Sequence, residues 1–308
     1  MLRSAPVTQA TTPIRDIAEI RELIACPLCK SSLSWTAEAA ECRLCGSRYE
    51  RRDGVWDFML HYPGFLHAVN HLWEHGQEEY EEWNEKLTDD YDREVASIDE
   101  VREIYTDEFS LSGRILDVGG HDGRLRHWLP ADAQYIGIDP YPAVKGAQKR
   151  PNLLRAYPVL QQPVSFVRAA AEQIPFAAET FDYVHMRSVI DHFGDPLRAL
   201  LEARRVLKPG GGLMIGIHVL GHQSTIPEGS AASVAIARFR KKVRDEGLVT
   251  ASKIAVGRII GSHKDEHIWH PTHDTLVQLV EMSRFRIEKS HWQKPPNDHV
   301  IYLMARKA

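Results

Sequence analysis

Short apolar runs alternate with glycine-rich or acidic turns through the second half of the chain. The first run, Arg114–Val118, ends in the glycine-rich turn 119–123, and apolar positions at helical spacing follow over Arg124–Leu129. A second run, Tyr135–Ile138, ends directly at Asp139. A strand, a tight glycine turn, a helix and a second strand ending in an acid predict a nucleotide-binding βαβ unit.

The same alternation continues to the C-terminus. We expect strands near residues 164–168, 181–186 and 213–216, with a helix over Ala199–Leu207 before the last of them. The runs Phe285–Glu288 and Val300–Met304 predict two final strands, which we expect to pair antiparallel at the edge of the sheet.

The glycine turn resembles a known family motif. Its spacing, Asp117-x-Gly119-x-His121-x-Gly123, is similar to motif I of class I S-adenosylmethionine-dependent methyltransferases, usually D/E-x-G-x-G-x-G, with His121 in place of the middle glycine. The resemblance implies an α/β fold, namely a Rossmann-like, seven-stranded, mostly parallel sheet with helices on both faces. It also implies that Asp139 binds the ribose hydroxyls of the cofactor.

Three later segments resemble the family in order and interval. Residues 164–176 are similar to V-x-G-D-A-E-x-L-P-F, residues 180–196 to F-D-x-V-x-x-x-x-x-L-x-H-x-x-D-P, and residues 205–211 to R-V-L-K-P-G-G. Ala170 stands where the family has the aspartate that contacts adenine. The resemblance covers residues 114–216 and implies binding of S-adenosylmethionine by Asp117, Gly119, Gly120, His121, Gly123, Asp139, Pro140, Ala170, Ala171, Glu172 and Arg187.

Candidate catalytic residues follow the predicted fourth and fifth strands. His192, Asp191 and His218 would face the cofactor, and a neutral imidazole suits proton removal from a hydroxyl acceptor. A structural, hydrogen-bonding role for His192 is the alternative. Four histidines at positions 263, 267, 270 and 273 either hold a metal or, as the family resemblance implies, lead into the helix before the sixth strand. In the second case His267 or His270 faces the substrate.

All four cysteines lie within twenty residues of one another, as two C-x-x-C pairs. Two tight turns that each present two thiolates suit tetrahedral zinc, and a filled shell predicts a structural metal. The alternatives, two disulfides or free thiols, fit less well. We therefore predict zinc bound by Cys26, Cys29, Cys42 and Cys45, with a hairpin between the pairs and a left-handed backbone at Gly46.

The cysteine segment also resembles a known module. Residues 24–30, 42–45 and 49–55 are similar to the zinc ribbon of Trm112-like proteins, C-P-x-C-x-x-x-L…C-x-x-C-x-x-x-Y-P-I-x-D-G-I-P, with Glu50-Arg51 and Trp56 as departures. We predict four regions: a flexible N-terminus over 1–19, the ribbon over 20–60, a helical bridge over 61–110, and a methyltransferase domain over 111–308. The last carries an inserted cap over 221–262, and Trp83 and Tyr91 of the bridge are candidates to cover the cofactor.

Charge is uneven although the formal net charge is only −4. From Glu74 to Glu108 fifteen acidic and three basic residues give a local charge of −12, and from Ile236 to Lys264 eight basic and two acidic residues give +6. These segments are either solvated helical faces or, for the basic one, a contact to an anionic substrate. No run of eighteen apolar residues and no secretory leader is present, so we expect a cytoplasmic chain with no membrane span.

Three functions fit these patterns. The first is methylation of a small molecule or a glycan or lipid precursor, on oxygen, by direct displacement. The second is RNA methylation, with the ribbon and the basic cap as the RNA contact. The third is a non-catalytic partner protein that keeps the fold, suggested by His121 and Ala170. A covalent cysteine mechanism is excluded because all four thiols belong to the ribbon.

Overall fold

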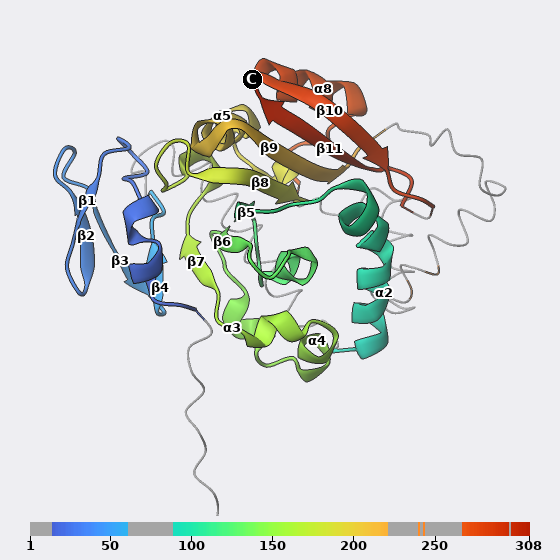
Figure 1. Ribbon diagram of the computed structural model, residues 1–308, viewed down its shortest axis with the longest axis horizontal. Helices are drawn as coiled ribbons and strands as arrows, with labels where there is room; N and C mark the ends of the chain where they lie inside the picture. The colour runs from blue at the N-terminus through green and yellow to red at the C-terminus, as the bar shows by residue number, and fades with distance from the viewer. Residues whose placement is uncertain (1–13, 61–88, 221–239, 241–242, 244–266, 296) are drawn as a thin grey trace, which may run out of the picture.

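A computed structural model describes residues 14–60, 89–220, 240, 243, 267–295 and 297–308 (Figure 1). The predictions for residues 1–13, for most of the bridge including Trp83, and for the inserted cap over 221–262 lie outside these residues.

In the described residues, eleven strands form one mixed sheet in the order β1-β2-β3-β4-β7-β6-β5-β8-β9-β11-β10. Their bounds are β1 Leu33–Trp35, β2 Ala39–Cys42, β3 Arg48–Arg52, β4 Val55–Asp57, β5 Arg114–Val118, β6 Gln134–Ile138, β7 Ser165–Arg168, β8 Phe181–Arg187, β9 Leu207–His218, β10 Phe285–Trp292 and β11 Val300–Lys307.

The last seven positions of that order carry the predicted Rossmann-like part. Strands β7, β6, β5, β8 and β9 are parallel, and β11 and β10 close that side as an antiparallel pair, as expected. The predicted total of seven strands is too low, however. Strand β4 of the ribbon pairs in parallel with β7, Trp56 opposite Val167, so the ribbon continues the sheet instead of standing apart from it.

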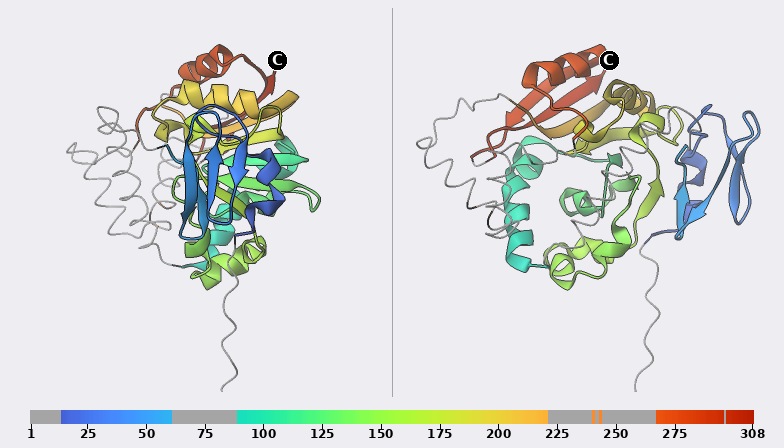
Figure 2. Two further views of the ribbon diagram at one scale, coloured as in Figure 1. Left: turned by 90° about the vertical axis from the view of Figure 1, so that its left-hand side faces the viewer. Right: turned by 180° about the vertical axis from the view of Figure 1, so that it is seen from behind.

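Helices cover both faces of the sheet (Figure 2). They are α2 Tyr91–Glu103 with a following π-helical turn Ile104–Glu108, α3 Val144–Ala147, α4 Pro151–Ala156, α5 Pro196–Val206 and α8 His273–Met282. Short 3-10 turns are η1 Ile17–Glu19, η2 Arg21–Leu23, η4 Arg124–Trp128, η5 Pro158–Gln161, η6 Ala171–Gln173 and η7 Ile190–His192. Helix α8 begins at the capping box formed by Thr272 and Thr275.

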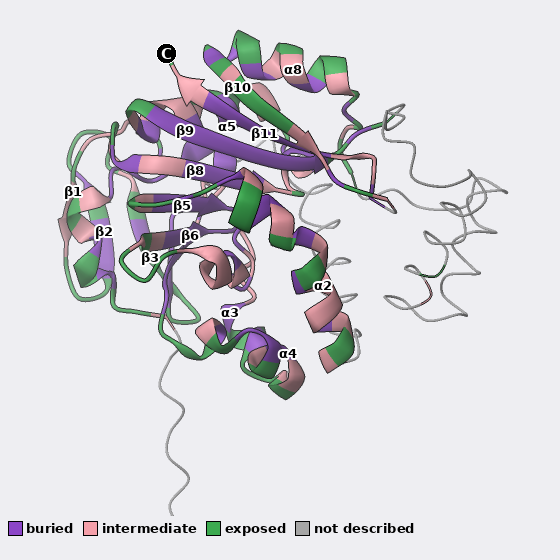
Figure 3. Ribbon diagram, turned by 45° about the vertical axis from the view of Figure 1, so that its right-hand side comes forward, coloured by how far each residue is buried: buried purple, intermediate pink, exposed green. Residues whose placement is uncertain are grey.

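Buried side chains of the central strands point alternately to the two faces of the sheet, so the core has two layers. Leu116 and Ile215 belong to the cluster that packs against α5 and α8, whereas Ile115 and Met214 belong to the cluster that packs against the end of α2. Successive side chains of a strand point to opposite faces, so one sheet serves both layers. Figure 3 shows the resulting buried belt along β5, β6, β8 and β9.

Polar and apolar contacts join the ribbon to the rest of the chain. The backbone of Ile24 bridges to Phe176, and the backbone N–H of Phe58 donates to the Arg168 carbonyl at 2.8 Å. Lys30 forms a 2.6 Å ion pair with Glu202 of α5. Apolar ribbon residues share one hydrophobic cluster with the parallel strands. The ribbon is thus packed as a part of the sheet and not as a tethered module.

Candidate functional site

A cavity of about 740 Å³ opens where the parallel strands end. It is lined by the turns after β5, β6, β7 and β8, by the end of β9, and by α2 on the outer side. The strand order reverses between β5 and β8, and ligands of open α/β sheets bind at such a switch point. The volume lies within the range of ligand pockets.

The glycine turn approaches the cavity in a left-handed backbone. Gly119 has φ 72°, and a β-carbon there would lie 2.3 Å from a methyl carbon of Val189, so only glycine fits. His121, in place of the family's middle glycine, also has a positive φ, 47°. A side chain is uncommon in this region and is strained there. His121 therefore keeps the backbone path of a glycine while adding an imidazole at the cavity wall.

Asp139 is buried at the end of β6 and is held by backbone donors. One carboxylate oxygen accepts from the N–H of His121 at 3.0 Å, and the other accepts from the N–H of Tyr141 at 2.8 Å. Burial raises the pKa of Asp139 to about 6, although His121 and the backbone donors oppose the shift. Each oxygen keeps a second lone pair for a ligand hydroxyl.

Asp117 is turned toward the interior. Its oxygens pair with Nδ1 of His185 at 2.7 Å and with the hydroxyl of Tyr135 at 2.8 Å. Nε2 of His185 in turn lies 2.8 Å from the hydroxyl of Tyr105. Burial raises the pKa of both tyrosines, so their hydroxyls stay neutral. This chain fixes the glycine turn against its neighbouring strands.

The wall after β7 has no aspartate for adenine, because Ala170 occupies that position. Glu172 lines the cavity, but one of its oxygens accepts from the N–H of Asp195 at 3.2 Å. Burial raises the pKa of Glu172. The carboxylate is thereby tied to the turn after β8, where the candidate catalytic residues lie.

In the cavity wall after β8, Asp191 and His192 meet His267 and form what we call the histidine–aspartate cluster. Nε2 of His192 lies 3.8 Å from one oxygen of Asp191, and Nε2 of His267 lies 3.4 Å from the other. His218, at the end of β9, has its ring 4.2 Å from that of His299. Of the three predicted catalytic residues, Asp191 and His192 are therefore together, whereas His218 makes an edge-to-face contact with His299.

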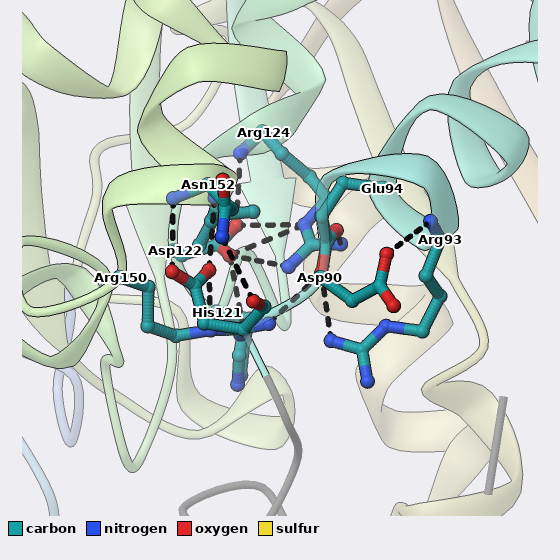
Figure 4. A network of polar contacts seen from close by, with 10 residues as sticks. Asp90, Arg93, Glu94, His121, Asp122, Arg124, Arg150 and Asn152 are labelled. Carbon is teal, nitrogen blue, oxygen red and sulfur yellow. Dashed lines mark hydrogen bonds and ion pairs between the residues drawn. The ribbon is translucent and has the colours of Figure 1, made fainter. Parts of the chain in front are cut away.

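One feature of the site was not predicted, a network of arginines and carboxylates (Figure 4) that lines the cavity. Glu94 of α2 accepts from Arg93 at 2.9 Å and from Arg150 at 2.8 Å, and Arg124 pairs with Asp122 at 2.6 Å while approaching Glu94 at 3.7 Å. Arg124 holds the pKa of Asp122 well below its usual range despite burial. The network fastens α2 to the glycine turn and closes one side of the cavity.

The structure thus brings thirteen of the fourteen predicted cofactor-binding and catalytic residues to one cavity. They are Asp117, Gly119, Gly120, His121, Asp139, Pro140, Ala170, Ala171, Glu172, Arg187, Asp191, His192 and His218. Gly123 is the exception: it precedes η4 with φ 82° and shapes the turn behind the wall. Tyr91 does not cover the cavity as expected, because its ring packs against the guanidinium of Arg155, 3.6 Å away.

The four cysteines meet at the tips of two knuckles. Sγ of Cys26 lies 3.6 Å from that of Cys45, Sγ of Cys29 lies 3.3 Å from that of Cys42, and all four sulfurs lie within 4.8 Å of one another. A zinc tetrahedron with bonds of about 2.3 Å has edges of about 3.8 Å. Gly46 has the predicted left-handed backbone, φ 75°. None of the four sulfurs is in a disulfide.

Part of the sequence matches known proteins. Residues 116–215 match the family model described as "Methyltransferase domain". An uncharacterized methyltransferase of Schizosaccharomyces pombe is 34% identical over 105 residues, 32% of this chain and 37% of that protein. The 27-O-demethylrifamycin SV methyltransferase of Amycolatopsis mediterranei is 24% identical over 251 residues, 73% of this chain and 91% of that protein.

A crystal structure of a SAM-dependent methyltransferase from Thermotoga maritima is 18% identical, with a TM-score of 0.44 over 77% of this chain and 99% of that one. The chain spans about half or less of the length of several curated relatives, such as 37% of the Schizosaccharomyces pombe protein and 45% of one from Mycolicibacterium vanbaalenii. The family match at residues 116–215 begins within β5 and ends within β9, so it covers the parallel strands that surround the cavity. Within the residues that the structure describes, no helix has both the length and the apolar character needed to cross a bilayer.

Proposed function

We propose that this chain methylates a hydroxyl oxygen of a small molecule, or of a glycan or lipid precursor, with S-adenosylmethionine as methyl donor. One observation carries the proposal: a single cavity brings together the glycine turn, the buried carboxylate of Asp139 and the histidine–aspartate cluster. The first two suit a nucleoside with free ribose hydroxyls. The third suits an acceptor that must lose a proton.

The residues present fit the cofactor. The glycine turn leaves room for close approach, and Asp139 retains a lone pair on each oxygen. When bound, S-adenosylmethionine supplies an electrophilic methyl group on a sulfonium. At Ala170 and Ala171 the cavity wall offers backbone groups, not a carboxylate, to the adenine ring of the cofactor.

The chain's own contribution to the reaction is positioning and proton removal. The carboxylate of Asp191 lies between two imidazoles, which it can orient and whose positive charge it can stabilise. A neutral imidazole of His192 or His267 can accept the hydroxyl proton of an acceptor in the cavity. Oxygen as the acceptor atom is also suggested by the relative from Amycolatopsis mediterranei, which is named 27-O-demethylrifamycin SV methyltransferase.

Calorimetry tests the cofactor half of the proposal. We expect the full chain to bind S-adenosylmethionine with one site, and Asp139→Ala to weaken binding by at least about tenfold, because hydrogen bonds to a charged group contribute about 1.5–3 kcal/mol. Lack of binding, or binding unchanged by Asp139→Ala, would contradict the proposal and favour the non-catalytic partner.

Transfer of a labelled methyl group tests the acceptor. Incubation with mixtures of small hydroxylated metabolites and, separately, with RNA should place label on the former. Label on RNA, with binding that weakens steeply as salt rises, would instead identify an RNA methyltransferase.

For the ribbon, we propose a structural zinc ion bound by Cys26, Cys29, Cys42 and Cys45. The support is the near-tetrahedral spacing of their sulfurs and the absence of disulfides among them. Elemental analysis of the purified chain should find about one zinc per molecule that is lost in Cys26→Ser; a metal-free native chain would contradict the assignment.

A further inference from the structure

The histidine–aspartate cluster has an unusual polar feature. One carboxylate oxygen of Asp191 is buried and has no hydrogen-bond partner in the structure. A buried polar atom left without a partner costs about 1–3 kcal/mol, so such atoms are rare unless they serve a ligand. The side chain lines the cavity, so a ligand at this oxygen would be part of the site.

The same side chain belongs to a convergent set of donors. One ligand atom each from Asp191, His192 and His267 can be chosen so that all three lie within 4.8 Å of one another. A divalent ion held at about 2.1 Å requires them slightly closer than that. The difference requires a rotation of the His267 ring, whose side chain is 42% exposed.

Hydrogen bonds to backbone carbonyls help to hold the cluster together. The N–H groups of Ile268 and Trp269 donate to the Asp191 carbonyl at 2.9 and 3.3 Å, and the indole N–H of Trp269 donates to the Ile190 carbonyl at 2.8 Å. These bonds dock the segment carrying His267 onto the turn carrying Asp191 and His192. Donors brought from two distant segments and fixed by backbone bonds form a preorganised site.

We propose that Asp191, His192 and His267 bind one divalent transition-metal ion, and that this ion holds a substrate with two adjacent oxygen donors, such as a vicinal diol or a hydroxy-carbonyl group. Two imidazoles and one carboxylate select a transition metal over Mg²⁺ or Ca²⁺, which prefer all-oxygen shells. Three protein ligands leave open positions, as in sites that bind substrate. These positions face the cavity assigned to the cofactor, so the inference rests on the proposed function.

The ion changes how the acceptor is activated. A hydroxyl bound to it has a lowered pKa and releases its proton to water. The oxygen then forms the new C–O bond while the C–S bond of the sulfonium breaks and its electron pair stays on sulfur. When the ion is bound, the imidazoles of His192 and His267 act as its ligands, and water takes the place of these imidazoles as the proton acceptor.

Metal binding is tested on the full chain with its ribbon loaded with zinc. Mn²⁺ does not displace zinc from thiolates. A decrease in the electron paramagnetic resonance signal of free Mn²⁺ therefore measures its binding at sites outside the ribbon. A parallel Co²⁺ titration distinguishes nitrogen and oxygen ligation from thiolate ligation by its absorption spectrum. We expect one additional site that weakens by at least about tenfold in His267→Ala and in Asp191→Asn.

His273→Ala is the matched control, since His273 belongs to the same C-terminal segment but its ring packs at a tilt beside that of Trp292. It should bind Mn²⁺ as the parent does. Asp191→Asn keeps the shape of the side chain and the backbone bonds, and thermal melting of each variant checks that the fold is retained. Absence of a site for both ions outside the ribbon, or equal binding by all variants, would overturn the inference.

Calorimetry with S-adenosylmethionine on the same samples separates the two proposals. If the chain binds the cofactor but no ion outside the ribbon, the metal inference is contradicted and the proposed methyltransferase function stands. If the chain binds the ion but not the cofactor, the proposed methyltransferase function is contradicted, and so is the proposed use of the ion. Binding of both, with the ion alone lost in His267→Ala, is the expected result.

Discussion

The cysteine cluster and the histidine–aspartate cluster are two convergent sets of donors at different places in one sheet. The first has four sulfurs at near-tetrahedral spacing, in a ribbon that lines none of the cavity in the described part of the chain. The second has three donors in the cavity wall, and one buried oxygen of its aspartate has no hydrogen-bond partner. A filled shell stabilises a fold, whereas an unfilled one is available for chemistry. The comparison teaches that donor number and location, more than residue type, separate the two roles.

The largest effect should come from the cysteine cluster. Cys26→Ser with Cys42→Ser should abolish binding of the zinc proposed for the ribbon, and zinc binding to such modules contributes about 10–16 kcal/mol at pH 7. Because β4 is hydrogen-bonded to β7, thermal melting of the whole chain should shift and not only that of the ribbon. Ser34→Ala, in the same ribbon, is the control. An unchanged melting profile of the cysteine variant would show that the ribbon has no structural role.

Next is the network beside the cavity. Glu94→Ala leaves three arginines near a missing carboxylate, and breaking a buried ion pair costs about 3–5 kcal/mol. Asp99→Ala, on the same helix but with an exposed carboxylate paired to Arg102, should cost about 1 kcal/mol or less. Urea denaturation measures both. Equal losses for the two variants would mean that the network does not anchor α2.

The glycine turn should give a smaller loss of stability but a clear loss of ligand. Gly119→Ala places a side chain in a left-handed backbone and against Val189, with strain of about 1–3 kcal/mol. Gly146→Ala, in helix α3 with open space around it, should instead stabilise by about 0.5–1 kcal/mol. Calorimetry with S-adenosylmethionine should show weakened binding only for Gly119→Ala; intact binding there would move the cofactor away from this turn.

The smallest effect is a dependence on pH. Asp139 has a pKa of about 6, above its unfolded value, so its contribution to the stability of the free chain is present at low pH and is lost as pH rises through 6. The affinity for the cofactor should instead increase as pH rises through 6, because the ionised carboxylate accepts hydrogen bonds from the ribose hydroxyls. Affinity should fall by up to about 1.4 kcal/mol per pH unit below 6. Asp139→Asn should flatten that profile, and a steep profile in this variant would assign the titration to another group.

The parallel strands and their turns could be predicted from the sequence because their signals are local. Apolar runs such as Arg114–Val118 end at glycines or acids, and the structure places strands and cavity-lining turns there. The final antiparallel pair and the ribbon hairpin were also predicted correctly. These features depend on residues close together in the sequence.

The contacts between distant segments could not be predicted. Pairing of Trp56 with Val167 joins two strands that have no shared local pattern, so the strand count was too low. Glu94 was part of an acidic run that is normally solvated, and only the fold surrounds it with arginines from three elements. The approach of His267 to Asp191 depends on backbone bonds that sequence spacing does not show.

The pairing of β4 with β7 also affects how the chain folds during its synthesis. Trp56 and its partner Val167 are 111 positions apart, so at about 5–20 residues per second a ribosome needs roughly 6–22 s to deliver β7 after β4. During that interval β4 presents an open strand edge, which is a surface for wrong pairing. The four cysteines and strands β1 to β4 all precede β7 in the chain, so this segment can fold, and can bind the zinc proposed for it, while the rest of the sheet is still being synthesised. Strand β7 then pairs with a β4 edge that is already formed.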